Sequence, residues 1–76
     1  MLLKEWIEMF GDNLSEIMED RHMSQQELSK ASGISIGSIN AYIHKQSPPG
    51  IKAIINLSYA LDVDPSELID FGYSIE

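Results

Sequence analysis

Residues 24–39 have the sequence SQQELSKASGISIGSI, which begins with a helix-start signal and has a glycine near its centre. Ser24 and Glu27 have the spacing of a capping box, in which each side chain binds a backbone N–H of the other residue. We therefore expect a short helix over residues 24–32. Gly33 adopts left-handed backbone angles without strain, so it is expected to end that helix.

A second short helix is expected directly after this glycine. Ser35 is placed to cap it, and the helix would extend over residues 36–44. Ile39 and either Tyr42 or Ile43 would lie on its inner side. Two helices joined by a tight turn with glycine form a helix-turn-helix, whose second helix enters the major groove of DNA.

An amphipathic helix is expected before this pair. Apolar residues recur there at steps of three and four, which places them on one helical face. They are Leu3, Trp6, Phe10, Leu14 and Ile17. Gly11, Asp12 and Asn13 interrupt this pattern, which predicts a short helix followed by another. The second of these would end near residues 20–22.

Two further helices are expected after Pro48 and Pro49, which break the chain between helices. The inner face of the first would consist of Ile51, Ile54, Leu57 or Ser58, and Leu61. The second begins at Asp64-Pro65-Ser66-Glu67, with an aspartate cap, a proline and a glutamate, and its apolar residues are Leu68, Ile69 and Phe71. The predicted fold is all-α, a compact five-helix bundle. Residues 10–76 would form the domain and residues 1–9 an N-terminal helical extension.

Charge is distributed unevenly along the 76 residues, whose net charge is −7. Residues 21–61 contain four basic residues against one acid, whereas the flanks contain Lys4 against eleven acids. The middle would attract a phosphate backbone and the ends would repel it. The acids are equally well explained as a solubilising surface, so charge alone does not identify the partner.

Several kinds of chemistry lack the residues they need. There is no cysteine, which excludes disulfides and thiolate sites. His22 and His44 do not have zinc-ligand spacing, the acidic runs do not match a calcium loop, and no serine–histidine–acid grouping follows from spacing. We expect no enzyme activity, metal, cofactor or small-molecule ligand.

The N-terminus does not have the pattern of a targeting signal. Lys4, Glu5 and Glu8 interrupt its apolar residues, which argues against a signal peptide. No run approaches the ~20 apolar residues of a membrane span. We therefore expect a cytoplasmic protein that does not bind membranes.

The helix pair resembles the Cro/cI-type (XRE, lambda-repressor-like) family. The resemblance rests on Gln25, the Glu27-Leu28 pair, Ala31, the Gly33-Ile34-Ser35 turn and Ile39. It continues through Pro49, Ile51, Ile54 and residues 57–63 to the capped last helix, and covers about residues 10–71. The combination is more specific than one short motif.

The resemblance implies a role for each matching residue. The side chains expected to face the groove and read bases are Ser35, Ile36, Gly37, Ser38, Asn40 and Ala41. Those expected to contact phosphate are Gln25, Lys45, Gln46, Ser47 and Lys52. Ala31, Ile34, Ile39 and Leu57 would be core positions.

The sequence departs from the family at two points. The expected recognition helix has no arginine, and Lys45 stands where relatives often have glycine. Ile36 would then contact a thymine methyl and Asn40 an adenine, with DNA shape adding to specificity. Alternatively, Ile36 is only an exposed helix residue, Asn40 faces water or caps, and Gln25 only begins its helix.

The resemblance implies a sequence-specific DNA-binding transcriptional regulator, a Cro-like phage or prophage repressor that binds double-stranded operator DNA as a homodimer. Apolar residues at one or both ends would form the dimer contact, unless they fold back onto the chain's own core: Leu2, Leu3, Trp6 and Ile7, and Phe71, Tyr73 and Ile75. The alternative is a protein-binding helix-turn-helix, an antirepressor or an antitoxin-like partner. The net charge and the absence of arginine favour that alternative, whereas Lys30, Lys45 and Lys52 beside the motif favour DNA.

Overall fold

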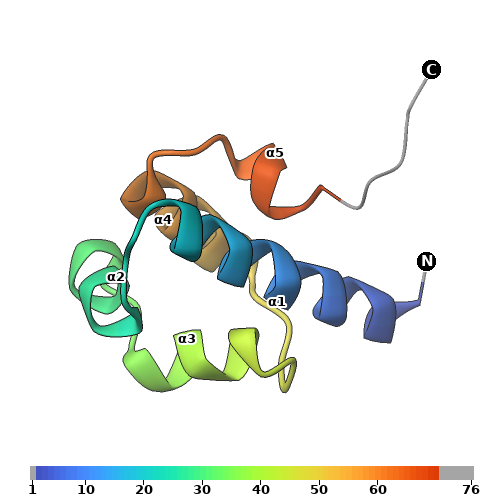
Figure 1. Ribbon diagram of the computed structural model, residues 1–76. Coiled ribbons are helices and arrows are strands. Elements are labelled where there is room, and N and C mark those ends of the chain that lie inside the picture. The colour runs from blue at the N-terminus through green and yellow to red at the C-terminus, as the bar shows by residue number, and fades with distance from the viewer. Residues whose placement is uncertain (1, 71–76) are drawn as a thin grey trace.

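The computed structural model describes residues 2–70, which form five helices and no strand (Figure 1). The helices are α1 (Leu3–Asp20), α2 (Gln25–Ser32), α3 (Ile36–Ile43), α4 (Ile51–Leu61) and α5 (Pro65–Leu68). The predicted all-α five-helix bundle is confirmed. The apolar residues Phe71, Tyr73 and Ile75 lie outside the described residues.

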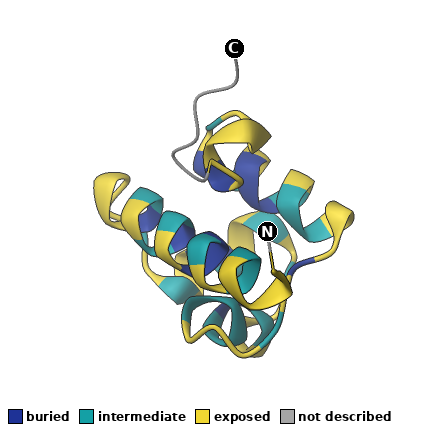
Figure 2. Cartoon of the chain, turned by 90° about the vertical axis from the view of Figure 1, so that its right-hand side faces the viewer, coloured by how far each residue is buried: buried dark blue, intermediate teal, exposed yellow. Residues whose placement is uncertain are grey.

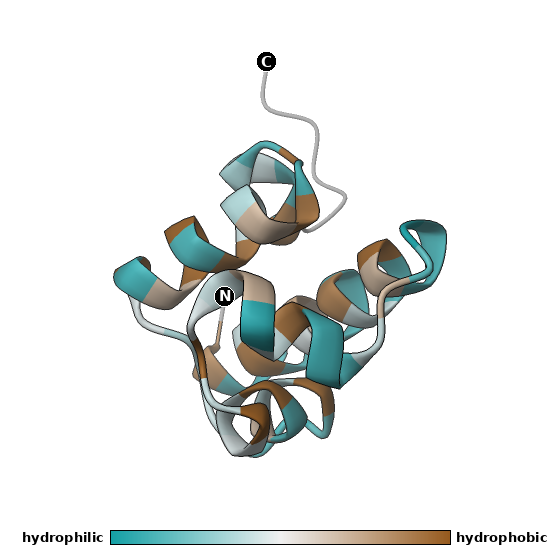
Figure 3. Cartoon of the chain, turned by 90° about the vertical axis from the view of Figure 1, so that its left-hand side faces the viewer, coloured by the Kyte–Doolittle hydropathy of each residue, from teal (hydrophilic) through white to brown (hydrophobic). Residues whose placement is uncertain are grey.

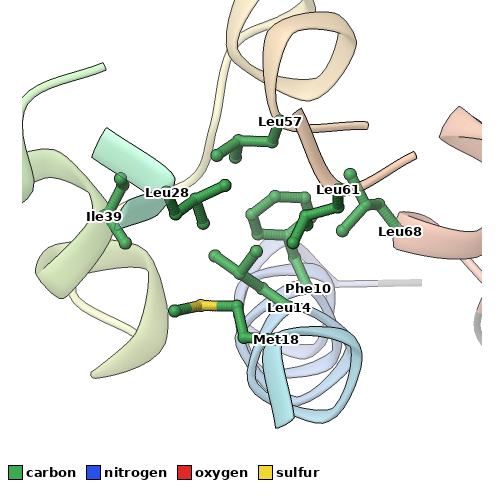
Figure 4. Close-up of a cluster of buried hydrophobic side chains, with 8 residues drawn as sticks. All are labelled: Phe10, Leu14, Met18, Leu28, Ile39, Leu57, Leu61 and Leu68. Atoms are coloured by element: carbon green, nitrogen blue, oxygen red, sulfur yellow. The ribbon is translucent and has the colours of Figure 1, made fainter. Parts of the chain in front are cut away.

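One hydrophobic core joins all five helices. α1 packs on α3 and α5, and α4 packs on α2 and α5. The buried side chains come from every helix, as Figure 4 shows, and they are surrounded by the exposed outer turns seen in Figure 2. They are Phe10, Leu14, Met18, Leu28, Ile39, Leu57, Leu61 and Leu68.

α1 is one continuous helix, so the predicted interruption at residues 11–13 is wrong. Gly11 lies in mid-helix and is buried. A Cβ added to it would lie 2.6 Å from the Tyr42 carbonyl oxygen and 3.4 Å from that of Ile43. The glycine is therefore there because the end of α3 approaches the α1 backbone closely, and not because the chain turns.

The predicted helix starts are confirmed. The Ser24 Oγ accepts a hydrogen bond from the Glu27 N–H, and Glu27 Oε1 accepts one from the Ser24 N–H, both at 3.1 Å. Asp64 and Glu67 form a second capping box at α5. At α3, the Ser35 side chain accepts from the Ser38 N–H at 3.2 Å. These side chains satisfy the N–H groups that a helix leaves unpaired in its first turn.

Three helices end in a left-handed residue that is not glycine. His22 (φ 53°), Lys45 (φ 62°) and Asp62 (φ 56°) follow α1, α3 and α4. After each of them the backbone N–H donates to a carbonyl five residues earlier, the bond of a Schellman motif. These bonds are Met23 to Met18 at 2.9 Å, Gln46 to Ala41 at 2.8 Å and Val63 to Ser58 at 3.0 Å. α1 thus ends where predicted.

Ala31 is exposed, so its predicted core position is wrong. α2 turns its inner side, formed by residues 25, 28, 29 and 32, towards α3 and α4. Ser29 is half-buried on this side, and its hydroxyl donates to the Ile34 carbonyl at 2.6 Å. Of the other predicted core residues, Ile39 and Leu57 are buried and Ile34 packs partly buried against them.

Ile51 and Leu3 are also more exposed than their patterns predicted, at 78% and 61%. Each is the first residue of its helix. Tyr42 and Ile43, between which the sequence did not distinguish, are both partly buried against the core, as is Trp6.

No helix within residues 2–70 has both the length and the apolar character that crossing a membrane requires.

Candidate nucleic-acid interface

The first turn of α3 forms a nearly uncharged surface of low relief. α3 lies along the lower edge of the bundle in Figure 1 and is anchored to it through Ile39. Ile36 is 50% exposed, and Gly37 is exposed with no atom within 4 Å of where a Cβ would be. Because Gly37 has no side chain, another molecule can approach the backbone of this turn closely beside Ile36.

The two serines of this turn bind each other. Ser35 is exposed and Ser38 half-buried, and the Ser35 hydroxyl donates to the Ser38 Oγ at 2.9 Å while accepting from the Ser38 N–H. Capping therefore occupies much of their hydrogen-bonding capacity. Among the predicted base-reading residues this leaves Ile36 and Asn40 with the largest side chains to offer, since Ala41 is half-buried and carries one methyl group.

Gln25 and Asn40 lie side by side. Asn40 Nδ2 donates to Gln25 Oε1 across 3.4 Å, a long hydrogen bond that connects the first residue of α2 to the middle of α3. Both side chains are half-buried. The contact uses one of the two Asn40 N–H donors, so the other donor and the Asn40 Oδ1 still suffice for a two-point pairing. The Gln25 Nε2 keeps its own donors for a phosphate.

Lys45 makes an ion pair with α1. Its Nζ lies 2.8 Å from Asp12 Oδ1. The hydrogen bond to Asp12 and the Asp12 charge, with a smaller contribution from the Glu8 charge, raise the pKa of Lys45 above the usual lysine value. Lys45 therefore carries its full charge at neutral pH, but a carboxylate already neutralises part of it.

The remaining predicted phosphate contacts lie on the chain after α3. Gln46 is exposed and Ser47 half-buried in the loop to α4, and Lys52 is exposed in the first turn of α4. Lys30 is exposed on α2. Their contacts with phosphate stay predictions.

Four acidic residues of α1 and of the chain around α5 gather on another side of the molecule. α1 and α5 enclose an open hollow of about 230 Å³, away from α3. Its lining is Asn13, Glu16, Ile17, Asp20, Glu67 and Asp70. Within the described residues no group of three or more acids or histidines has the geometry to hold a metal ion. Glu16, Asp20, Glu67 and Asp70 thus lie away from the α3 surface, whereas Asp12 and Glu8 lie beside Lys45 at the end of α3.

Three residues of this region escaped sequence reasoning: Glu8, Gly11 and Asp12. Each acts on the end of α3 from a distant part of the chain, and no local pattern indicates such a contact. The sequence does mark Lys45 as unusual, since a left-handed position there suits glycine better. Its partner could be found only from the packing of α1 against α3.

The chain is similar to a known family and to solved structures. A family model described as the Cro/C1-type HTH DNA-binding domain matches residues 13–72, from the second half of α1 through α5. The crystal structure of the restriction-modification controller protein C.AhdI from Aeromonas hydrophila is similar, with a TM-score of 0.78 and 29% sequence identity. That similarity covers 82% of this chain and 94% of the other. None of the curated proteins compared with the chain matches it.

Proposed function

The chain belongs to the Cro/C1-type helix-turn-helix family of DNA-binding domains, and we propose that it is a repressor that binds operator DNA as a homodimer. The resemblance predicted from the sequence is confirmed, and the chain is a DNA-binding transcription regulator. Repression, the dimer and the base-reading residues belong to the proposal. In it the chain acts by binding alone, without a catalytic step.

One observation carries the proposal: the exposed start of α3 with a polar amide one turn further on. Ile36 and Asn40 are four residues apart and share a helical face. An isoleucine offers apolar contact to a thymine methyl, and an asparagine amide pairs with both hydrogen-bonding groups of adenine. Gln25 holds the Asn40 amide across 3.4 Å and so limits its rotation. We therefore expect an A·T-containing half-site.

The test begins with selection of bound sites from a random DNA pool. Asn40→Ala should then weaken binding to the selected site by about 1–3 kcal/mol and relax the preference at one base pair. Ile36→Ser should act at a neighbouring base pair. Both variants should bind unrelated DNA nearly as the parent does, because base contacts add little to non-specific binding.

Asn56→Ala, on α4, is the matched control and should keep the parent's preference. Thermal unfolding of each variant separates lost contacts from lost stability, which matters because Asn40 also contacts Gln25. If both α3 variants keep the full preference of the parent, α3 is not the reader. A parent that selects no sequence would favour the protein-binding alternative.

An uncharged row on α4 is the surface we assign to the dimer. Ile51, Ile55 and Tyr59 follow one another at steps of four and are 78%, 51% and 89% exposed. Figure 3 shows hydrophobic segments on α4 as well as inside the bundle. An aromatic side chain alone covers about 150–250 Å², and exposed apolar patches of a few hundred Å² are typical of interaction sites.

A second copy of the chain fits this row better than another partner. Two copies that each carry a net charge of −7 repel each other, so they meet most favourably over uncharged side chains. The three side chains of the row are uncharged, although Asp62, Asp64 and Glu67 border Ile55 and Tyr59. A two-fold axis would bring the row against itself. Two copies are also what an operator of two half-sites about one DNA turn apart requires.

Sedimentation distinguishes this row from the N-terminal end, one of the two ends expected from the sequence. Ile55→Glu should dissociate the dimer, and Leu3→Glu, a comparable charge on an exposed α1 residue, should not. The opposite result would assign the dimer to the N-terminal end. A parent that sediments as a monomer, both free and on DNA, would contradict the homodimer.

Two settings are open to such a repressor. The family resemblance favours a Cro-like protein of a phage or prophage. The similarity to C.AhdI, a restriction-modification controller protein, favours control of restriction and modification genes as the second candidate. Locating the selected sequence upstream of genes in the source genome would decide between them.

A further inference from the structure

Lys45, the proposed phosphate anchor at the end of α3, is folded back against α1. Its Nζ lies 2.8 Å from Asp12 Oδ1, and the two side chains are 40% and 66% exposed. The lysine stem passes over Gly11, since its Cγ would lie 3.0 Å from a Cβ added there. The charged group is therefore held beside a carboxylate at the surface of the protein.

We propose that Asp12 competes with DNA phosphate for Lys45 and thereby sets the sequence-independent part of the DNA affinity. This inference rests on the proposed function, because it concerns the same surface. Lysine carries one compact charge with three N–H donors, so a phosphate that reaches it comes close to Asp12. Either the ion pair opens, or two negative charges share one cation and repel each other. Each phosphate contact of Lys45 therefore contributes less than that of an unpaired lysine.

Glu8 strengthens the competition. It precedes Asp12 by four residues and so lies on the same side of α1. Glu8 and Lys45 line one open hollow of about 280 Å³, together with Leu3, Lys4 and Ile7. The two acids lower the positive potential at the end of α3, whereas Lys30 and Lys52 have no ion pair among the described residues. Backbone contacts at this end of the surface therefore add little to the affinity for DNA that lacks the matching bases.

The competition acts on the backbone contact, and backbone contacts are common to all DNA sequences. It lowers affinity for specific and unrelated DNA together and leaves the base preference to α3. A phosphate contact normally releases a counterion, and the released Asp12 would take one up. The salt dependence of binding should therefore be shallower than the number of basic residues near the surface suggests.

Asp12→Asn tests this inference, with Glu16→Gln as the matched control. Both residues are exposed acids of α1 and each change removes one charge, but Glu16 lines the hollow beside α5. Binding to an unrelated duplex is measured by fluorescence anisotropy at several salt concentrations. Asp12→Asn should bind roughly two- to fivefold more tightly at low salt, the range expected of one exposed ion pair. The slope of log K against log salt should steepen by up to about one unit, whereas Glu16→Gln should keep the parent slope.

Lys45→Ala in both backgrounds completes the experiment. It should weaken binding only slightly in the parent and several-fold more in Asp12→Asn. Equal effects in the two backgrounds, or an Asp12→Asn protein that binds no more tightly than Glu16→Gln, would overturn the competition while leaving DNA binding intact. A parent that binds no duplex at all would overturn the proposed function, and the inference with it.

Discussion

Gly33 and Lys45 both have left-handed backbone angles at the end of a helix, but their surroundings differ. Gly33 ends α2 with φ 76° and has nothing within 4 Å of where a Cβ would be. Lys45 follows α3 with φ 62°, is bound to Asp12 and lies across Gly11. The first position is held by its own backbone preference and the second by contacts from α1.

The difference divides the helix-turn-helix into a part held by contacts between residues close in sequence and a part held by packing against another helix. The beginning of the helix-turn-helix forms from residues adjacent in sequence: Ser24 with Glu27, Gly33, and Ser35 with Ser38. The end of α3 is positioned by packing, so its geometry depends on a helix that begins more than thirty residues earlier. Substitutions at the two ends should therefore have different consequences.

The largest effect is expected at Gly11. Gly11→Ala should destabilise the protein by about 1–3 kcal/mol, because the new methyl meets the Tyr42 carbonyl and α1 must move away from α3. Gly37→Ala is the control in open space within α3 and should stabilise by about 0.5–1 kcal/mol. Urea denaturation of both variants measures the difference. A Gly11→Ala protein as stable as Gly37→Ala would show that α1 and α3 do not meet closely.

Gly33→Ala should cost about 1–2 kcal/mol for a different reason. Alanine at a left-handed position is strained even where there is space, since its Cβ crowds the adjacent carbonyl. The loss should therefore appear without any disturbance of α1, which Trp6 fluorescence reports separately. Equal stability of parent and variant would mean that the turn relaxes to other angles.

At position 45, introducing a glycine should relieve the kind of backbone strain that Gly33→Ala creates. Both Lys45→Gly and Lys45→Ala lose the ion pair to Asp12, but only glycine relieves the left-handed strain. We expect Lys45→Gly to be more stable than Lys45→Ala by about 0.5–1 kcal/mol in thermal denaturation. An alanine variant at least as stable as the glycine variant would argue against left-handed angles here.

The smallest effect concerns pH and the start of α2. Hydrogen bonds from the Ser24 backbone and side chain hold the pKa of Glu27 below its usual value. The folded state therefore binds fewer protons than the unfolded state, and this contribution to stability is lost as pH falls between about 5 and 3. Glu27→Gln should be less stable than the parent at pH 7, and the difference should shrink at pH 3. If the difference in stability between the parent and Glu27→Gln did not depend on pH, the charge of Glu27 would not be its cause.

The same division explains how much the sequence could predict. Capping boxes, the glycine turn and the proline break are local, and all of them lie where the pattern indicated. Ile51 was misplaced because periodicity describes a face but not how far the neighbouring helices reach along it. Ala31 was assigned to the core by the family resemblance, whereas α2 here turns residues 25, 28, 29 and 32 inwards. Gly11 looked like a break because a glycine that permits close approach and a glycine that turns the chain are identical in sequence.

The candidate site divides in the same way. Its residues on α3 follow from the motif, since the spacing after Gly33 determines which of them point outwards. The connection between Gln25 and Asn40, the pairing of Lys45 and the apolar row on α4 do not follow from it. Each depends on the angle or distance between two helices, or on a face left uncovered.

The close approach of Gly11 to Tyr42 limits how the protein could be retargeted. An engineer who exchanges the recognition helix for that of a relative will choose where the graft ends. The outward-facing residues among 36–41 can be exchanged if Ile39, which anchors α3 in the core, is kept, because the α3 contacts of Gly11 begin only at Tyr42. Residues 42–45 should be kept, since the carbonyls of Tyr42 and Ile43 and the Lys45 stem pack against Gly11 of this α1. A graft carried through residue 45 would import an ending shaped for another first helix.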